Sequence, residues 1–215
     1  FLNKKNSTIA NINPKYALKH PNWKMGKKIS IDSATLMNKI LEVIEAKKIF
    51  DLDINKFKIT IHPKSYIHAV IHYKNGLVKF LAHDTDMTVP ILNSLYMNGK
   101  KFIYNEGNLN LKILNGINFL EPDKKKFPVI SLLSKIKNKP SYFETILITI
   151  NDFLVHKYLN GDINYFSLNK NLTNLIKNPY FKRYYKLRPK KIIDIKIMVN
   201  KVTTYLNKKN ILNEN

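Results

Sequence analysis

The sequence predicts an α+β protein, in which a mixed sheet with helices is followed by a small all-α helical bundle. The first observation is a pair of strand-like segments, 66–73 and 77–82, joined by a Lys-Asn-Gly turn that is typical of a β-hairpin. The second is that apolar residues recur at three- and four-residue spacing after residue 128, as in packed helices. A stretch rich in Asn, Gly, Lys and Pro separates the two patterns. We therefore expect one domain over residues 1–104, a linker over 105–128 and a helical domain over 129–215.

The elements follow from the local pattern of residues along the chain. Residues 2–19 are polar and predict a loop with one helical turn over 14–18. Residues 28–32 alternate weakly, as in a short strand, and from residue 35 the spacing becomes helical. The strands expected next are 57–61, 66–73 and 77–82. The helical segments expected in the last part are 129–136, 142–159, 168–176 and 192–206.

The composition is that of a folded chain with a strong basic excess. Hydrophobic residues make up 44% of the 215 residues and aromatic residues 11%, enough to build a core. The formal net charge of +22 attracts polyanions, so a basic nucleic-acid-binding protein is the rival class. The excess is nearly all Lys, is spread along the chain and accompanies many Asn, Ile, Tyr and Phe, which AT-rich codons favour. We therefore attribute the charge to a biased genome and expect no specific nucleic-acid partner.

Cysteine and long apolar runs are both absent from the sequence. Without cysteine the chain has no disulfide framework, no thiolate metal site and no cysteine nucleophile. No apolar run is long enough to span a bilayer, and no signal peptide is recognisable at the first residues. We therefore expect no membrane association and a cytoplasmic location, in a bacterium with an AT-rich genome or in a plastid.

The helix that begins near residue 35 carries a polar stripe beside its apolar face. At about 100° per residue, Asn38, Glu42 and Glu45 point within roughly 60° of one another, so two carboxylates and an amide converge. Ser33 stands in the position of an N-cap, where its hydroxyl, the first backbone amides and Lys39 form a candidate phosphate site. The pattern indicates a phosphate next to a divalent cation. The alternative is a solvated helix face with Ser33 as a simple cap.

The residues around this helix resemble a known enzyme family. HPNWKMGKKISIDSATLMNK at 20–39, followed by LEVIEA at 41–46, is similar to the signature of 1-deoxy-D-xylulose 5-phosphate reductoisomerase, an NADPH-dependent enzyme of the methylerythritol phosphate isoprenoid pathway. IHPKSYIHAVIHYKNG and DMTVPI resemble segments that follow in the family. The similarity is strong over roughly the first hundred residues and weak afterwards, where Asn151 and Asp152 resemble the family's Asn-Glu pair.

The resemblance implies roles for individual residues of the first domain, which would then be the catalytic domain. Glu42 would bind a divalent metal, Mg²⁺ or Mn²⁺, and Glu45 would be a second catalytic carboxylate that supports the metal or the proton transfers. His20, Trp23 and Met25 would lie in a flap that closes over the substrate, with Met25 also beside NADPH. The residues implied to contact the substrate are His20, Trp23, Met25, Ser33, Asn38, Lys39 and His68. His62 and His72 are left as structural.

The resemblance also implies what lies outside the chain. The family converts 1-deoxy-D-xylulose 5-phosphate, a phosphorylated sugar, to 2-C-methyl-D-erythritol 4-phosphate, and it forms homodimers. The chain starts at Phe1 rather than Met, and no G-x-G-x-x-G turn occurs in it. We therefore expect a C-terminal portion, with the NADPH domain and the other metal ligands upstream, that is inactive by itself.

Two departures from the family pattern leave a second alternative open. The family has Gly directly after the Asn-Lys pair, but Ile40 stands there in this chain, and a branched side chain would crowd any close approach of backbone or ligand. The second departure is the diverged half of the chain after residue 104. Both would also fit a degenerate relative that keeps the fold and has lost catalysis.

Overall fold

The computed structural model describes residues 2, 12–18, 25–96 and 111–208. The chain divides into two compact units. We call Phe1–His20, Met25–Lys58 and Pro122–Asn215 the helical unit, and Pro21–Lys24 with Ile59–Glu121 the hairpin unit. The expected split into domains 1–104 and 129–215 stays a prediction, but the compact units have other bounds. Residues 25–58 belong with the C-terminal helices, which neither spacing nor composition indicated.

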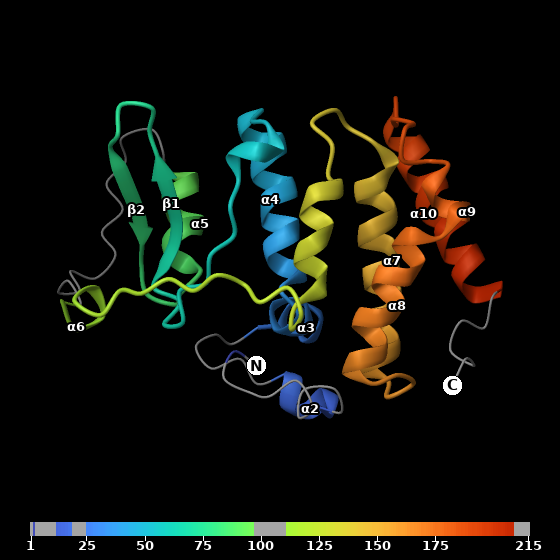
Figure 1. The fold of residues 1–215 in the computed structure, drawn as a ribbon, viewed down its shortest axis with the longest axis horizontal. Coiled ribbons are helices and arrows are strands. Elements are labelled where there is room, and N and C mark those ends of the chain that lie inside the picture. Colours follow the sequence, from blue (N-terminus) through green and yellow to red (C-terminus); the bar gives the residue numbers. More distant parts are fainter. Residues whose placement is uncertain (1, 3–11, 19–24, 97–110, 209–215) are drawn as a thin grey trace. The chain divides into compact units, whose positions relative to one another are not determined.

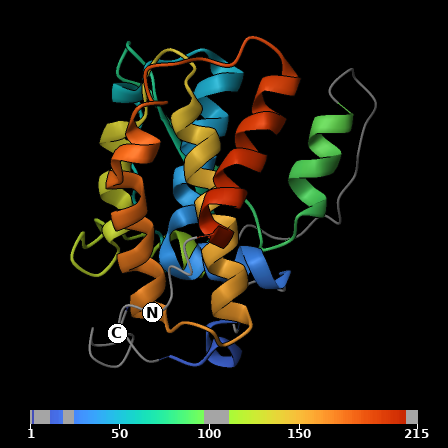
Figure 2. The same cartoon turned by 90° about the vertical axis from the view of Figure 1, so that its right-hand side faces the viewer.

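The helical unit is built from helices that pack side by side. Helix α7 packs against both α8 and α10, and α3 packs against α4 and α7 (Figures 1 and 2). Fully buried side chains such as Ile31, Ile40, Leu147 and Phe181 form its core. The elements of this unit are α2 (Pro14–Ala17), α3 (Lys27–Thr35), α4 (Met37–Phe50), η1 (Ile54–Lys56), η2 (Pro128–Lys135), α7 (Tyr142–Leu159), α8 (Tyr165–Lys177), α9 (Pro179–Lys182) and α10 (Ile192–Lys208).

The hairpin unit contains an antiparallel pair of strands. β1 (Ile67–His72) pairs with β2 (Val78–Ala82) through the predicted turn, where Gly76 has φ of 88°, a conformation that glycine adopts without strain. The same unit includes α5 (Thr88–Leu95), α6 (Leu111–Leu114) and an isolated bridge between Ile61 and Leu120. Helix α6 and Leu120, one of the two residues of this bridge, lie inside the stretch 105–128, so its described part contains ordered elements.

Most of the C-terminal helices agree with their predicted positions because local signals define their ends. Ser141 caps α7: its hydroxyl accepts from the Phe143 amide and donates to the Glu144 carboxylate, so the expected segment 142–159 is matched at both ends. Asn164 caps α8 in the same way by accepting from Ser167. The segment 129–136 is helical, but of the 3₁₀ type, in η2.

The predicted strand over 28–32 is wrong, because these residues belong to α3. Gly26 enters the helix with extended backbone, and the Ser30 hydroxyl donates to its carbonyl at 2.9 Å. Lys28 and Asp32 form an i,i+4 ion pair at 2.7 Å that only a helix brings together. A weak alternation over five residues is too short to distinguish a strand from one turn of a buried helix.

In the part of the chain that the structure describes, residues 57–61 form no strand. Ile61 makes the single bridge to Leu120, and the sheet of the described residues is the two-stranded hairpin β1–β2. The α+β class itself is confirmed, since helices and this hairpin occupy separate parts of the chain. In the described ranges, no helix is both long enough and apolar enough to cross a bilayer.

Candidate active site

A single residue, Leu36, interrupts the helix between α3 and α4. Leu36 has φ of 61° and ends α3 while starting α4. The side chain that serves the first turn of α4 belongs to Thr35, whose hydroxyl accepts from the Met37 amide at 3.3 Å. The predicted N-cap role of Ser33 is therefore wrong, because Ser33 lies half-buried in the last turn of α3. Helix α4 begins only after Leu36, whose left-handed backbone conformation the sequence did not reveal.

Three polar side chains meet on the first turns of α4. The Asn38 amide donates to Glu42 Oε1 at 2.6 Å, and Lys39 Nζ donates to both carboxylate oxygens of Glu42 at 3.0 and 2.8 Å. The side chains of Lys39 and Glu42 are 40% and 46% exposed, so the pair is open to a ligand. Glu45 is exposed on the same helix, about one turn further along. The predicted convergence of Asn38 and Glu42 is thus found, with Lys39 as a third member.

Ile40 lies in the core of the helical unit. Its side chain has 0% exposure, as has that of Met37, while Ile44 is 5% exposed. Asn38, Lys39 and Glu42 are more accessible than these three residues, so the polar cluster and the buried face are different sides of α4. The isoleucine at this position therefore occupies core space and not the space beside the polar cluster.

A buried carboxylate links α3 to α7. Asp32 is 0% exposed, and its two oxygens accept from Lys28 Nζ at 2.7 Å and from the Asn151 side-chain amide at 2.8 Å. Lys28 Nζ also lies 3.0 Å from Asp152 Oδ1. Burial lowers the pKa of Lys28, but hydrogen bonds and charges from Asp32 and Asp152 outweigh it and raise that pKa above 10.5. Lys28 therefore stays charged between the two carboxylates.

The flap residues are described only in part. His20 and Trp23 lie outside the described residues. Met25 is half-buried and directly precedes Gly26, which starts α3.

His68 lies at an irregularity of the hairpin unit. The strand register shifts between Ile67 and Ala69, so His68 occupies a β-bulge, a feature that turns a side chain away from simple alternation. Its ring stacks on that of His83, with centroids 3.7 Å apart, and its Nε2 lies 3.0 Å from the His83 carbonyl oxygen. Because a carbonyl can only accept, this contact places the proton of a neutral His68 ring on Nε2.

His62 has a structural environment. Its Nδ1 accepts from the backbone amides of Tyr66 and Ile67, both at 3.1 Å, and holds the turn that leads into β1. Burial, with a contribution from the charge of Lys64, lowers the pKa of His62 below 6.5. His72 is exposed on β1.

Comparison with known proteins decides the family. A profile described as "1-deoxy-D-xylulose 5-phosphate reductoisomerase C-terminal domain" matches residues 1–50, and one described as "DXP reductoisomerase C-terminal domain" matches residues 83–203. The chain belongs to the 1-deoxy-D-xylulose 5-phosphate reductoisomerase family. The polar cluster of α4 lies within the first match and Asn151 within the second.

Individual members of the reductoisomerase family cover most of the chain. The enzyme of Pelagibacter ubique is 46% identical over 195 residues, which is 91% of this chain and 50% of that protein. The Clostridium tetani enzyme is 40% identical, over 85% of this chain and 47% of that protein. The chain thus spans about half the length of these curated relatives.

Solved reductoisomerase structures have the same fold. A structure "in complex with NADPH, fosmidomycin and magnesium" has a TM-score of 0.85 at 30% identity, and covers 97% of this chain and 53% of its own. The Zymomonas mobilis enzyme in complex with NADPH has a TM-score of 0.82 at 27% identity, with 99% and 53% coverage. The fold class predicted from the sequence and the family resemblance are both confirmed.

The described residues can supply only part of a metal site. Glu42 is an exposed carboxylate with an amide and an ammonium group beside it. In the ranges that the structure describes, no group of three or more His, Cys, Asp or Glu side chains comes close enough to hold a metal. Mg²⁺ requires near-octahedral oxygen ligands, and the exposed carboxylate of Glu42 is chemically suited to supply one of them.

Sequence reasoning missed the residues that hold α3 in place. Asp32 was assigned to a strand, and Lys28 had no role. A signal was present, because Lys28 and Asp32 are four residues apart and only a helix makes that spacing a contact. The partner Asn151 is 119 residues away in the sequence, so no local pattern connects it to Asp32.

Proposed function

We propose that this chain forms the substrate-binding and helical part of an enzyme that converts 1-deoxy-D-xylulose 5-phosphate to 2-C-methyl-D-erythritol 4-phosphate. NADPH is the hydride donor and Mg²⁺ or Mn²⁺ the metal. The observation that carries the proposal is the contact of Asn38, Lys39 and Glu42 on α4, in the part of the chain that the family profile matches. Relatives solved with NADPH, fosmidomycin and magnesium support the choice of cofactors.

In this proposal, different residues of the polar cluster on α4 bind the metal cation and the substrate phosphate. Glu42 is the metal ligand, and Glu45 is a second carboxylate that supports the metal or the proton transfers. Lys39, with Asn38 and Ser33, binds the phosphate through charge-assisted and neutral hydrogen bonds. In the structure Lys39 is paired with Glu42 at 2.8 Å, so Lys39 must exchange this carboxylate for the phosphate when the substrate binds.

The remaining residues orient and enclose the substrate. His68 contacts the substrate, and its ring is already held by stacking on His83. His20, Trp23 and Met25 close over the substrate and exclude water from the reacting carbons, with Met25 also beside the nicotinamide cofactor. When bound, the metal polarises the substrate carbonyl and NADPH supplies the hydride.

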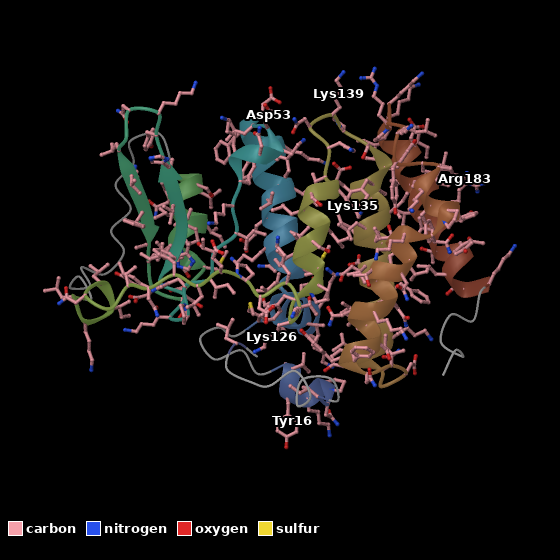
Figure 3. The ribbon with its side chains drawn as sticks, viewed as in Figure 1. Tyr16, Asp53, Lys126, Lys135, Lys139 and Arg183 are labelled. Carbon is pink, nitrogen blue, oxygen red and sulfur yellow. The ribbon has the colours of Figure 1, made fainter. Side chains whose placement is uncertain are left out.

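We also propose a homodimer in the bacterial cytoplasm, which the family resemblance supports, as does the bacterial origin of the relatives. A nucleic-acid-binding function is not favoured. Basic side chains of the helical unit come from separate places on its surface, as the labelled Lys126, Lys135, Lys139 and Arg183 show (Figure 3). A binder of single strands would need basic and stacking aromatic groups gathered along one groove.

Replacement of Glu42 tests the proposal in the complete enzyme that contains this chain. Glu42→Gln keeps the size of the side chain but removes a negative ligand, so turnover should fall by about a hundredfold or more and recover only in part with excess Mn²⁺. Asp53→Asn, which removes one exposed carboxylate elsewhere in the helical unit, is the control and should leave turnover unchanged.

Two outcomes would contradict the proposal at different points. Near-parental turnover of Glu42→Gln at limiting Mn²⁺ would show that Glu42 is not a metal ligand. Absence of turnover in the parent enzyme, with NADPH and metal supplied, would refute the activity and favour a non-catalytic relative that keeps the family fold.

A further inference from the structure

The C-terminal helices make polar contacts with α3 that the proposed chemistry does not use. On α7, Asn151 donates to Asp32 and Asp152 forms an ion pair with Lys28. On α8, the buried hydroxyl of Tyr165 donates to the carbonyl oxygen of Ala34 at 2.8 Å. Three successive contacts, to residues 28, 32 and 34, thus join α3 along its length to helices more than a hundred residues away in the sequence.

The burial of Asp32 makes the pairing of its carboxylate oxygens energetically important. A buried carboxylate is stable only when its oxygens are paired, and an apolar residue of similar size would pack into the same place at lower cost. Both oxygens of Asp32 are paired, one with Lys28 of its own helix and one with Asn151 of α7. A rotation of α3 about its axis would break the second pair and leave a charge buried without a partner, so the pair fixes the rotation.

The rotation of α3 sets the direction of a residue with a proposed role. Ser33 follows Asp32 directly and therefore points about 100° away from it around the helix. The carbonyl of Ser33 accepts from the Leu36 amide at 3.2 Å, in the turn that joins α3 to α4. The contacts that fix the position of Asp32 therefore also fix the position of Ser33 and of the first turn of α4, which carries Asn38 and Lys39.

We propose that Asp32, Asn151 and Asp152 are positioning residues for the substrate phosphate: α7 holds α3 in the rotation that directs Ser33 at the phosphate. This rests on the proposed function, since the phosphate belongs to its substrate. Helix α7 then contributes to substrate affinity through α3, although Asp32, Asn151 and Asp152 do not touch the substrate.

The chain offers a matched pair of substitutions to test this. Asp152 pairs with Lys28 of α3 at 3.0 Å, and Asp162 pairs with Lys157 of α7 at 3.0 Å, with carboxylate side chains 46% and 39% exposed. Asp152→Asn and Asp162→Asn in the complete enzyme should therefore lower stability equally little. Only Asp152→Asn should raise KM for 1-deoxy-D-xylulose 5-phosphate, by about two- to fivefold, with kcat nearly unchanged. It alone should speed amide hydrogen exchange over residues 27–35.

A second set of variants tests the buried pair. Asn151→Leu removes the donor to Asp32 and should raise KM about tenfold or more where the variant folds. The exchanged pair Asp32→Asn with Asn151→Asp restores an amide donor and a carboxylate acceptor, so it should return KM to within about twofold of the parent. A role in stability alone would give no such recovery of KM at equal melting temperature.

The KM and hydrogen-exchange measurements distinguish a failure of the positioning role from a failure of the proposed function. Equal KM in Asp152→Asn and Asp162→Asn, or faster exchange over 27–35 without a change in KM, would overturn the positioning role. An inactive parent enzyme would refute the proposed function and with it the substrate assignment. An active parent with unaltered KM in Asp152→Asn refutes only the inference drawn here.

Discussion

Replacement of Ile40 by alanine separates a core role from a site role at the position where the resembled family has glycine. If Ile40 crowded the site, a smaller residue would improve substrate binding. The structure places the side chain in the core at 0% exposure, so the smaller residue should instead destabilise the protein and leave binding unchanged. The two roles thus predict effects on different quantities.

The magnitude follows from the burial of Ile40. Ile40→Ala removes three carbon atoms, which at about 0.8 kcal/mol each gives about 2.4 kcal/mol of lost transfer free energy. The cavity that remains adds to this, for a total destabilisation of about 3–5 kcal/mol. Leu41→Ala removes the same number of carbon atoms from the next residue of α4, which is only half-buried, and should cost about 1 kcal/mol.

Urea unfolding followed by circular dichroism gives the free energy of unfolding of each variant. Substrate affinity of the complete enzyme is then measured under conditions in which both variants are folded, and it should equal that of the parent. A cost of Ile40→Ala no greater than that of Leu41→Ala would refute the core assignment. Tighter substrate binding by Ile40→Ala would refute the separation of the core from the polar cluster.

Three further predictions concern the phosphate site, a buried histidine and the chain by itself. Lys39→Ala in the complete enzyme should weaken binding of the phosphorylated substrate by about 1.5–3 kcal/mol, or about ten- to a hundredfold, and leave the dephosphorylated analogue unaffected; equal losses at one ionic strength would remove Lys39 from the phosphate site. The pKa of His62 is lowered in the folded protein, so just below pH 6.5 the His62 ring is protonated in the unfolded chain but not in the folded one. The stability that His62 contributes should therefore be fully present above pH 6.5 and decrease as the pH falls below this value. Chemical unfolding at a series of pH values measures this, and His62→Gln should show a shallower decrease; the same slope in both would contradict it. Residues 1–215 alone should neither bind NADPH nor oxidise it with substrate, and measurable oxidation by the purified chain would count against a separate nucleotide domain.

Much of the local structure and part of the site could be predicted from the sequence because the responsible contacts are short-range. The contact of Asn38 with Glu42 follows from four-residue spacing on a helix, whatever surrounds that helix. The hairpin follows from its Asn-Gly turn, and α7 from its Ser141 cap and apolar spacing. The long signature around residue 33 likewise identified the family from the residues themselves.

The tertiary structure alone decided how these elements are joined. Residues 28–32 are helical because Ile31 and Asp32 are buried, and Asp32 is paired with a residue 119 positions away. The break at Leu36, which moves Ser33 from a cap to the end of α3, needs a left-handed residue whose strain packing must offset. The sequence suggested that Ile40 would crowd the site where the family has Gly, but in the fold its side chain is buried in the core. Burial and long-range pairing depend on what the rest of the chain brings alongside, which spacing within one segment cannot specify.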